Sequence, residues 1–154
     1  MTAYFLDSST LVKRYVVETG SIWVQTITTH SSHNTIYVAQ IARVEVVSAF
    51  ARRKREFSLP TRSARAAYLT LLRHTKRQYD VVPMTETIMS LAETLLDKYI
   101  LRASDAIQLA SALEVQSRLT AARLSGIVFV AGDNRLLTAA VGEGLTVDNP
   151  NNYP

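Results

Sequence analysis

The sequence predicts an α/β fold in which helices cover both sides of a short, mainly parallel β-sheet. Three observations lead to this prediction. Short segments that are apolar throughout are typical of strands buried on both faces in a parallel sheet. Longer segments with apolar residues at helical spacing separate them, so that strands and helices alternate along the chain. The chain has 154 residues, enough for one domain with its own core, and we expect residues 1–154 to form a single domain.

The first half of the chain is predicted to form two strands and three helices. A short apolar run ends at Asp7, and a carboxylate followed by hydroxyl residues is a typical helix cap. The polar, glycine-containing segment 18–21 breaks the helix that follows. After a polar turn, a run of β-branched and aromatic residues predicts a strand. The expected elements are a strand at 3–6, a helix to Val17, a helix over about 22–29, a strand at 34–38 and a helix over 40–55.

The second half continues the alternation. Pro60 suits the first turn of a helix, and Ile88, Ala92 and Leu95 fall on one face of another. Ser104 is a helix cap, and an all-apolar run precedes the Gly132–Asp133 turn. The expected elements are helices over 60–79, 85–98, 104–123 and 134–141, strands at 81–83, 127–131 and 145–147, and an exposed tail at 149–154.

Composition limits the possible functions. The hydrophobic fraction is 47% and the charged fraction 19%, which is typical of a folded protein. The formal net charge of +4 and the sequence pI near 9.6 favour a polyanionic partner. The absence of cysteine excludes disulfides and thiolate metal sites. We find no signal peptide and no apolar run long enough to span a bilayer, so we expect a cytoplasmic location without a membrane partner.

Four acidic residues, Asp7, Glu45, Asp105 and Asp133, interrupt or close apolar segments. Asp7 and Asp133 directly follow expected strands, so both lie at the carboxyl edge of the sheet, where ligands bind in this class of fold. A helix that leads into a parallel strand runs against that strand, which places Asp105 at the same edge. Buried carboxylates are costly unless they are paired or bind a cation. Together they predict an oxygen-rich site for Mg²⁺ or Mn²⁺, and a basic protein with such a site points to phosphodiester chemistry.

Glu45 is the acid that lies within a helix rather than at its start. It is one to two turns from the expected helix start, or about 8–10 Å at a rise of 1.5 Å per residue. Its neighbours at helical spacing are small or apolar, so we expect the side chain to point inward. These neighbours are Ile41, Ala42, Ser48 and Ala49.

Each acid also has an ordinary structural interpretation. Asp7 can cap the first helix, and Asp105 can be a first-turn acid that favours the helix dipole. Asp133 can belong to a simple turn. Glu45 can pair with a cation such as Arg43. We favour the shared site because four independent coincidences at one edge are less probable than one common cause.

The order of these motifs resembles the PIN-domain nucleases, and most closely the VapC-like toxins of type II toxin–antitoxin pairs. The similarity extends over residues 3–150, and the segment 102–110 is especially like those toxins. One departure is that Ala131 and Gly132 stand where many relatives have a hydroxyl residue before the fourth acid. The motifs that carry the resemblance are Tyr4-Phe5-Leu6-Asp7-Ser8-Ser9, Glu45 within a helix, Ser104-Asp105-Ala106 and Phe129-Val130-Ala131-Gly132-Asp133.

The resemblance implies a three-layer α/β/α sandwich and a Mg²⁺-dependent endoribonuclease, with Mn²⁺ as a substitute, that leaves a 5′-phosphate and a 3′-hydroxyl. It implies that Asp7, Glu45, Asp105 and Asp133 are the catalytic and metal-binding residues, with Asp7 and Asp105 as the principal ligands. It also implies that a cognate antitoxin covers the site and that the toxin is a homodimer. Supporting roles are expected for Ser8 or Thr10 through their hydroxyls, and for Asn134, which orients water or metal or only caps a helix.

Basic residues are concentrated in the middle of the chain. We consider three roles for them: contact with the RNA backbone, contact with an acidic antitoxin segment, or a solvated helix end, since cations suit helix C-termini. The three histidines have no metal-ligand spacing, and we expect them at the surface. The candidate RNA-binding residues are Lys13, Arg14, Arg52, Arg53, Lys54 and Arg55.

Two other functions compete with the nuclease prediction. An aspartyl phosphatase or phosphotransferase also places an aspartate after its first strand. Such enzymes commonly need a second acid two residues later, where this chain has Ser9. The other alternative is a catalytically silent PIN-like module that binds RNA or protein, and the presence of all four acids argues against it.

Overall fold

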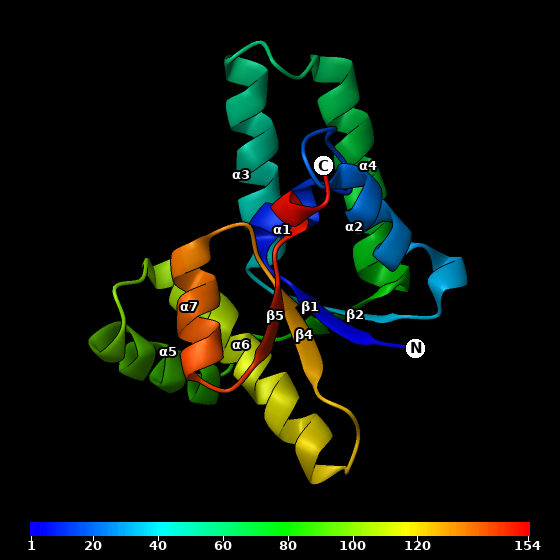
Figure 1. The fold of residues 1–154 in the computed structure, drawn as a ribbon. Helices are drawn as coiled ribbons and strands as arrows, with labels where there is room; N and C mark the ends of the chain where they lie inside the picture. The colour runs from blue at the N-terminus through cyan, green and yellow to red at the C-terminus, as the bar shows by residue number, and fades with distance from the viewer.

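The computed structural model describes all residues, 1–154, and its centre is a five-stranded, entirely parallel sheet (Figure 1). The strand order is β3-β2-β1-β4-β5. The central strand β1 pairs with β2 on one side and β4 on the other, with Phe5 opposite both Tyr37 and Phe129. The strands are β1 (Ala3–Leu6), β2 (Thr35–Ala39), β3 (Tyr79–Val82), β4 (Ile127–Val130) and β5 (Thr146–Asp148).

Seven α-helices and two short 3₁₀ helices surround the sheet. None of the helices combines the length and the apolar composition needed to cross a bilayer. The α-helices are α1 (Ser8–Val12), α2 (Ser21–Thr28), α3 (Ala42–Arg55), α4 (Thr61–Arg77), α5 (Glu86–Lys98), α6 (Ala103–Ala121) and α7 (Asn134–Gly142). The 3₁₀ helices are η1 (His30–Ser32) and η2 (Pro150–Asn152).

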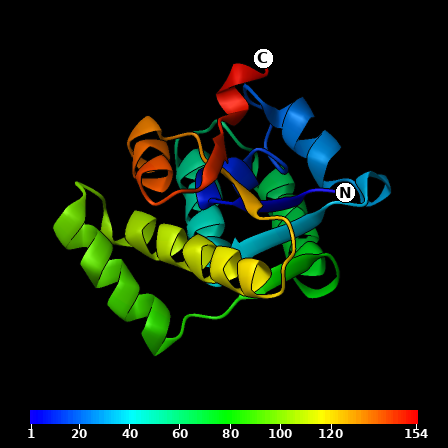
Figure 2. The same ribbon diagram turned by 60° about the horizontal axis from the view of Figure 1, so that its bottom comes forward.

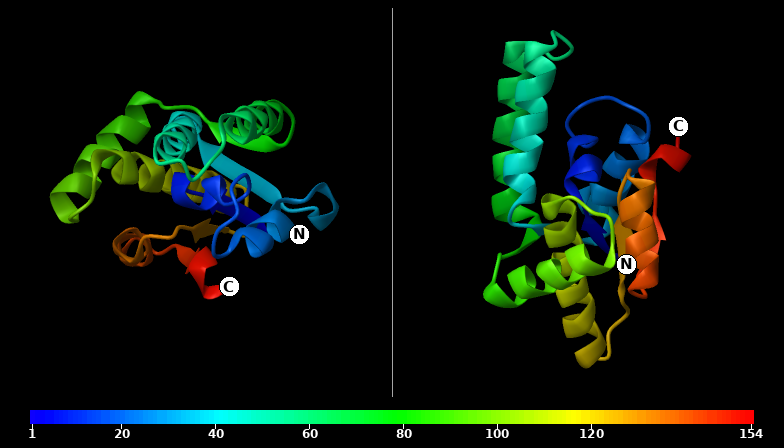
Figure 3. Two further views of the ribbon diagram at one scale, coloured as in Figure 1. Left: turned by 90° about the horizontal axis from the view of Figure 1, so that it is seen from above. Right: turned by 90° about the vertical axis from the view of Figure 1, so that its left-hand side faces the viewer.

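Each face of the sheet has its own apolar core, because successive side chains of a strand point to opposite faces. Phe5 packs in the core formed with α5, α6 and α7, and its ring stacks on Phe129 at 5.8 Å. Leu6 packs in the core formed with α1, α3 and α4. Figure 2 shows α5 and α6 side by side below the sheet, and Figure 3 shows the helices on its two sides. The predicted parallel sheet and α/β/α layering are therefore confirmed.

The order of the strands determines where a site can form. From β1 the chain builds outward through β2 to β3, then returns to add β4 and β5 on the other side of β1. The sheet therefore changes direction between β1 and β4. In open parallel sheets, ligands bind beyond the carboxyl ends of the strands at such a switch point. The residues that follow these strands are Asp7 and Asp133.

Two expected boundaries were wrong. The first helix ends at Val12 rather than Val17, because the chain turns back so that the buried Lys13 ammonium binds the Glu18 carboxylate and the Thr19 carbonyl, each at 2.9 Å. Strand β3 begins two residues earlier than expected, at the buried Tyr79. The tail is mainly exposed, as expected, although Pro150 is buried; it forms η2, and the Tyr153 ring stacks on Trp23 at 4.4 Å.

Candidate active site at the carboxyl edge of the sheet

An open cavity of about 1040 Å³ lies at the carboxyl ends of β1 and β4. The structure brings all four predicted acids into this one cavity, although they come from four different parts of the chain. It is mainly polar, and its lining also includes several cations. The acids are Asp7, Glu45, Asp105 and Asp133.

Asp7 is the most buried of the four, with 4% of its surface exposed. It follows β1 directly and caps α1, accepting hydrogen bonds from the Thr10 backbone N–H at 3.0 Å and the Ser9 hydroxyl at 2.8 Å. Burial disfavours the charged form more than these donors favour it, and it raises the pKa of Asp7 to about 6. The capping interpretation is therefore correct, but a cap does not need such a desolvated carboxylate.

Glu45 lies on α3 and is held by a residue of α6. The buried Gln108 donates a hydrogen bond of 2.7 Å from Nε2 to Oε1 of Glu45. The other amide atom, Oε1 of Gln108, is buried without a hydrogen-bond partner. Glu45 forms no ion pair, and Arg43 instead lines a separate, smaller cavity, so the expected alternative of a Glu45–Arg43 pair is wrong.

The carboxylates of Asp105 and Asp133 are close enough for their like charges to interact. Asp105 lies in the first turn of α6, where burial raises its pKa and the negative charge of Asp133 raises it further. Asp133 is exposed and caps α7, accepting a hydrogen bond of 2.8 Å from the Arg135 backbone N–H. The two helices thus begin at the same cavity with an acid each.

No three of these carboxylates are close enough to form a ready-made metal site. Protein donors hold three of them instead: Asp7 by Ser9 and Thr10, Glu45 by Gln108, and Asp133 by Arg135. The donor set nevertheless fits Mg²⁺, which keeps several of its waters and usually takes only one or two carboxylates directly. The desolvated Asp7 is the carboxylate whose charge a cation would stabilise most. The role of the four acids as metal ligands remains a prediction.

Ser9 is a supporting residue that sequence reasoning missed. Its hydroxyl donates to Asp7 and accepts a hydrogen bond of 3.0 Å from the Gly132 backbone N–H, so it links the ends of β1 and β4. A side chain at Gly132 would approach the Ser9 oxygen to 3.3 Å, closer than ordinary contact. Positions 131–132 have no hydroxyl of their own, but the Ser9 hydroxyl, which follows β1, bonds the Gly132 backbone at the end of β4.

The expected supporting residues have different roles. The Thr10 hydroxyl donates at 3.0 Å to the Val130 carbonyl and ties α1 to β4. Ser8 lines the cavity. Asn134 also lines it, and its side-chain oxygen accepts a hydrogen bond of 3.1 Å from Asn149.

The expected cationic residues separate into two groups. Lys13, Arg52 and Arg53 line the cavity, as do Arg102 and Arg135, which the sequence did not single out. Lys13 and Arg53 both form ion pairs with Glu18. The remaining expected residues, Arg14, Lys54 and Arg55, do not line the cavity.

Arg14 was assigned to the wrong place. Its guanidinium donates to the Tyr79 hydroxyl at 2.6 Å and to Gln78 at 2.8 Å, on the side of the sheet where β3 begins. His74 was also wrongly expected at the surface. It is half-buried between Tyr15 and Tyr79, and burial lowers its pKa to about 4. This cluster joins α1 to α4 and β3 and takes no part in the cavity.

Comparison with known proteins agrees with this geometry. The PIN domain family model matches residues 4–141. The chain is 30% identical over 148 residues to Ribonuclease VapC47 of Mycobacterium tuberculosis (strain CDC 1551 / Oshkosh), an alignment that covers 95% of this chain and 96% of that one.

Two solved structures share the fold. FitAcB from Neisseria gonorrhoeae superposes with a TM-score of 0.64 at 13% identity, covering 96% of this chain and 97% of that one. VapBC2 from Rickettsia felis, bound to a DNA fragment from its promoter, superposes with a TM-score of 0.62 at 11% identity, covering 96% and 98%. The expected resemblance is confirmed. The chain belongs to the PIN domain family and is a VapC-type member of it.

Proposed function

We propose that this chain is a divalent-metal-dependent endoribonuclease that hydrolyses RNA phosphodiester bonds as the toxin of a toxin–antitoxin pair. The observation that carries the proposal is one cavity in which four acids from distant parts of the chain meet five cations. Acids alone would suit many metal sites, whereas acids surrounded by arginine and lysine suit a metal with a polyanionic substrate. Similarity to a ribonuclease over nearly the whole length of both chains supports the same function.

The acids have different parts in the proposed mechanism. Asp7 and Asp105 would hold Mg²⁺ directly, and Glu45 and Asp133 would hold its waters. When bound, the ion lowers the pKa of a water and neutralises charge on the scissile phosphate. Ser9 fixes the Asp7 carboxylate and Gln108 fixes that of Glu45, so both acids are oriented before substrate arrives.

The cations position the substrate. Arg102 directly precedes the helix that carries Asp105, and Arg135 follows Asp133 by two residues. Each arginine is therefore close in the sequence to one of the acids and lines the same cavity. Arg52 and Arg53 reach the same cavity from α3. Phosphate groups on either side of the scissile bond would bind these side chains, which fixes the RNA backbone across the acids.

The partner of the toxin would be a cognate antitoxin that covers this cavity. The solved neighbours include a toxin–antitoxin complex from Klebsiella pneumoniae with a TM-score of 0.54, in addition to VapBC2. We also propose that residues 1–154 act as one nuclease domain and that the toxin is a homodimer, as the family resemblance implies.

The direct test is incubation of the purified, antitoxin-free chain with total RNA, with EDTA or with Mg²⁺, followed by mapping of the cut ends. We expect cleavage only with Mg²⁺ or Mn²⁺, leaving 5′-phosphate and 3′-hydroxyl ends, and none with Asp7→Asn. Asp7→Asn keeps a good helix-capping side chain, so its loss of activity would not reflect loss of the fold. Full activity of Asp7→Asn on RNA would overturn the assignment.

A further inference from the structure

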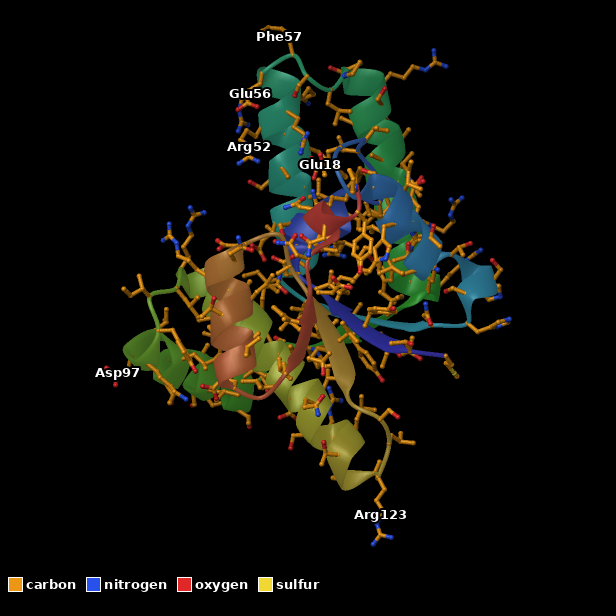
Figure 4. All side chains as sticks on the ribbon, viewed as in Figure 1. Glu18, Arg52, Glu56, Phe57, Asp97 and Arg123 are labelled. Carbon is orange, nitrogen blue, oxygen red and sulfur yellow. The ribbon has the colours of Figure 1, made fainter.

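Helices α3 and α4 form a hairpin that projects beyond the rest of the molecule (Figure 3). Phe57 lies in the loop that joins them, at the tip of the hairpin (Figure 4). Phe57 is 95% exposed, more than any other large apolar residue of the chain. An isolated exposed apolar residue is common on protein surfaces. Two further observations set Phe57 apart.

The first observation is the backbone conformation of Phe57. Glu56 is the C-cap of α3, and Phe57 follows it with a φ of 57°. The Phe57 N–H bonds the Lys54 carbonyl and the Ser58 N–H bonds the Arg53 carbonyl, which is the Schellman arrangement. Glycine is the favoured residue at this position, and a bulky side chain there is unusual. The turn does not require a phenyl ring, and packing does not explain it.

The second observation is the charge around the tip. Glu56 is the only acid between Glu45 and Asp80 in the sequence, against nine lysines and arginines. Lys54 and Arg55 end α3, and Arg62 and Arg65 lie at the start of α4, all of them exposed. Cations at the end of α3 suit its dipole, but those at the start of α4 do not. Helix stability therefore accounts for only part of this charge.

The tip is continuous with the acidic cavity. Glu45, Ala49 and Arg52 lie on one face of α3 and all line the cavity. The same helix ends at Arg55, two residues before Phe57, and at a rise of 1.5 Å per residue the segment from Glu45 to the tip is about 18 Å long. At about 3.4 Å per nucleotide of a stacked strand, that distance corresponds to roughly five nucleotides. One strand can thus reach both the acids and the tip.

We propose that the hairpin tip is a contact site for single-stranded RNA, in which Phe57 stacks on a base and the surrounding cations bind the adjoining phosphates. Aromatic side chains within a basic surface are the usual means of binding single strands. Apart from Pro60, the exposed residues next to Phe57 in the sequence are charged or polar, and they are mainly basic, which favours a polyanionic strand. This inference rests on the proposed nuclease function and adds a substrate contact remote from the scissile bond.

The test measures the Kd of a fluorescein-labelled oligouridylate of about 12 nucleotides, within the usual site size of single-strand binders. Fluorescence anisotropy in EDTA avoids cleavage and needs no metal. Phe57→Ala should raise the Kd by about five- to one-hundredfold, the effect of losing one base–aromatic stack. Phe57→Trp should bind at least as tightly as the wild type.

A matched pair of variants separates RNA binding from stability. Arg123 has the same φ of 57° after the C-cap of α6, and it lies at the opposite end of the molecule from Phe57 (Figure 4). Phe57→Gly and Arg123→Gly should both raise the midpoint of thermal unfolding, but only Phe57→Gly should weaken RNA binding. Leu124→Ala, which removes an exposed apolar side chain beside Arg123, should leave the Kd unchanged.

Equal Kd values for the wild type and Phe57→Ala would overturn the inference, whether the tip then binds a protein or nothing. Cleavage of total RNA by the wild type would leave the proposed function intact in that case. A wild-type chain that binds no oligouridylate would overturn the tip contact as well. A chain that binds RNA through Phe57 but does not cut it with any divalent ion would contradict the nuclease proposal alone.

Discussion

Gln108 donates a hydrogen bond of 2.7 Å to Glu45, and this contact joins α6, which carries Asp105, to α3. Gln108 follows Asp105 by three residues, so one turn of α6 supplies an acid to the cavity and also orients a second acid. The other amide atom of Gln108 is buried without a hydrogen-bond partner. Such an arrangement is difficult to explain by stability alone, because an unpaired buried oxygen is unfavourable.

Replacing Gln108 tests whether it positions Glu45. Gln108→Met keeps the length of the side chain but removes both the donor and the unpaired oxygen. We expect the free energy of unfolding to be unchanged or higher, and RNA cleavage to fall by roughly 10–100-fold, as for other residues that orient metal ligands. Thermal unfolding and kcat measure the two effects.

Gln116→Met is the matched control on the same helix. Gln116 accepts a hydrogen bond of 2.9 Å from the Ile127 backbone N–H and does not line the cavity. Its replacement should lower stability without changing kcat. If Gln108→Met and Gln116→Met changed stability and kcat in the same way, Gln108 would be only a structural residue.

The raised pKa of Asp7 predicts how stability depends on pH. Between about pH 4 and pH 6 the folded metal-free protein holds a proton on Asp7 that the unfolded chain releases. Stability from this group is therefore highest in acid and falls as pH rises to about 6. The shift from 3.8 to about 6 corresponds to roughly 3 kcal/mol.

Asp7→Asn should remove this dependence. In EDTA the variant should be more stable than the wild type by up to about 3 kcal/mol at neutral pH, and the difference should vanish below about pH 4. Urea unfolding at a series of pH values measures it. A wild type that is as stable as Asp7→Asn at neutral pH would show that Asp7 is not desolvated. Divalent metal should narrow the difference, because it binds the ionised wild type.

Glu18 neutralises two cations of the cavity, Lys13 and Arg53 (Figure 4). Glu18→Gln should free both for phosphate and tighten binding of oligouridylate at low salt. The slope of log Kd against log salt should steepen by up to about 1.4, since each phosphate contact on a single strand adds about 0.7. The variant should also lose on the order of 2 kcal/mol of stability, because Lys13 is buried.

Glu143→Gln provides the comparison for Glu18→Gln. It breaks the Lys98–Glu143 ion pair, and neither of these residues lines the cavity. It removes the same charge, so any general effect of net charge appears in both variants. RNA affinity that rises equally in both would show that Glu18 does not restrain the cavity cations.

Strain at the two helix ends gives a stability prediction that is independent of RNA. Phe57 and Arg123 both hold positive φ values after a helix C-cap. Glycine adopts this conformation without the penalty of about 1–2 kcal/mol that other residues have, although it gains entropy when unfolded. Phe57→Gly and Arg123→Gly should therefore each stabilise the chain by about 1 kcal/mol. If urea unfolding showed both variants to be less stable than the wild type, the backbone at Phe57 and Arg123 would not be strained.

The sequence was informative wherever local pattern determines structure. Apolar runs predicted all five strands, and the acids just beyond the ends of β1 and β4 could be placed at one edge because parallel strands end together. Glu45 could be placed inward because its helical neighbours are small or apolar. These inferences need only the periods of helix and strand.

Side-chain direction in short turns and pairing across the fold were not predictable in this way. Ser9 rather than Thr10 gives its hydroxyl to Asp7, because α1 is too short for helical periodicity to apply. Gln108 and Glu45 are 63 residues apart, and nothing local marks them as partners. Arg14 was misplaced because the chain leaves the helix at Val12, and its side chain then bonds Tyr79 and Gln78 instead of reaching the cavity.

The measurement that most directly tests the central claim is a calorimetric titration of the purified chain with Mn²⁺, paired with cleavage of total RNA. The variants are Asp7→Asn, Asp105→Asn and the control Asp97→Asn, whose carboxylate is exposed on α5 away from the cavity (Figure 4). The wild type and Asp97→Asn should bind Mn²⁺ saturably and cut RNA, and the two cavity variants should lose both properties. Unchanged Mn²⁺ affinity and cleavage in Asp7→Asn and Asp105→Asn would contradict a metal site built from these acids.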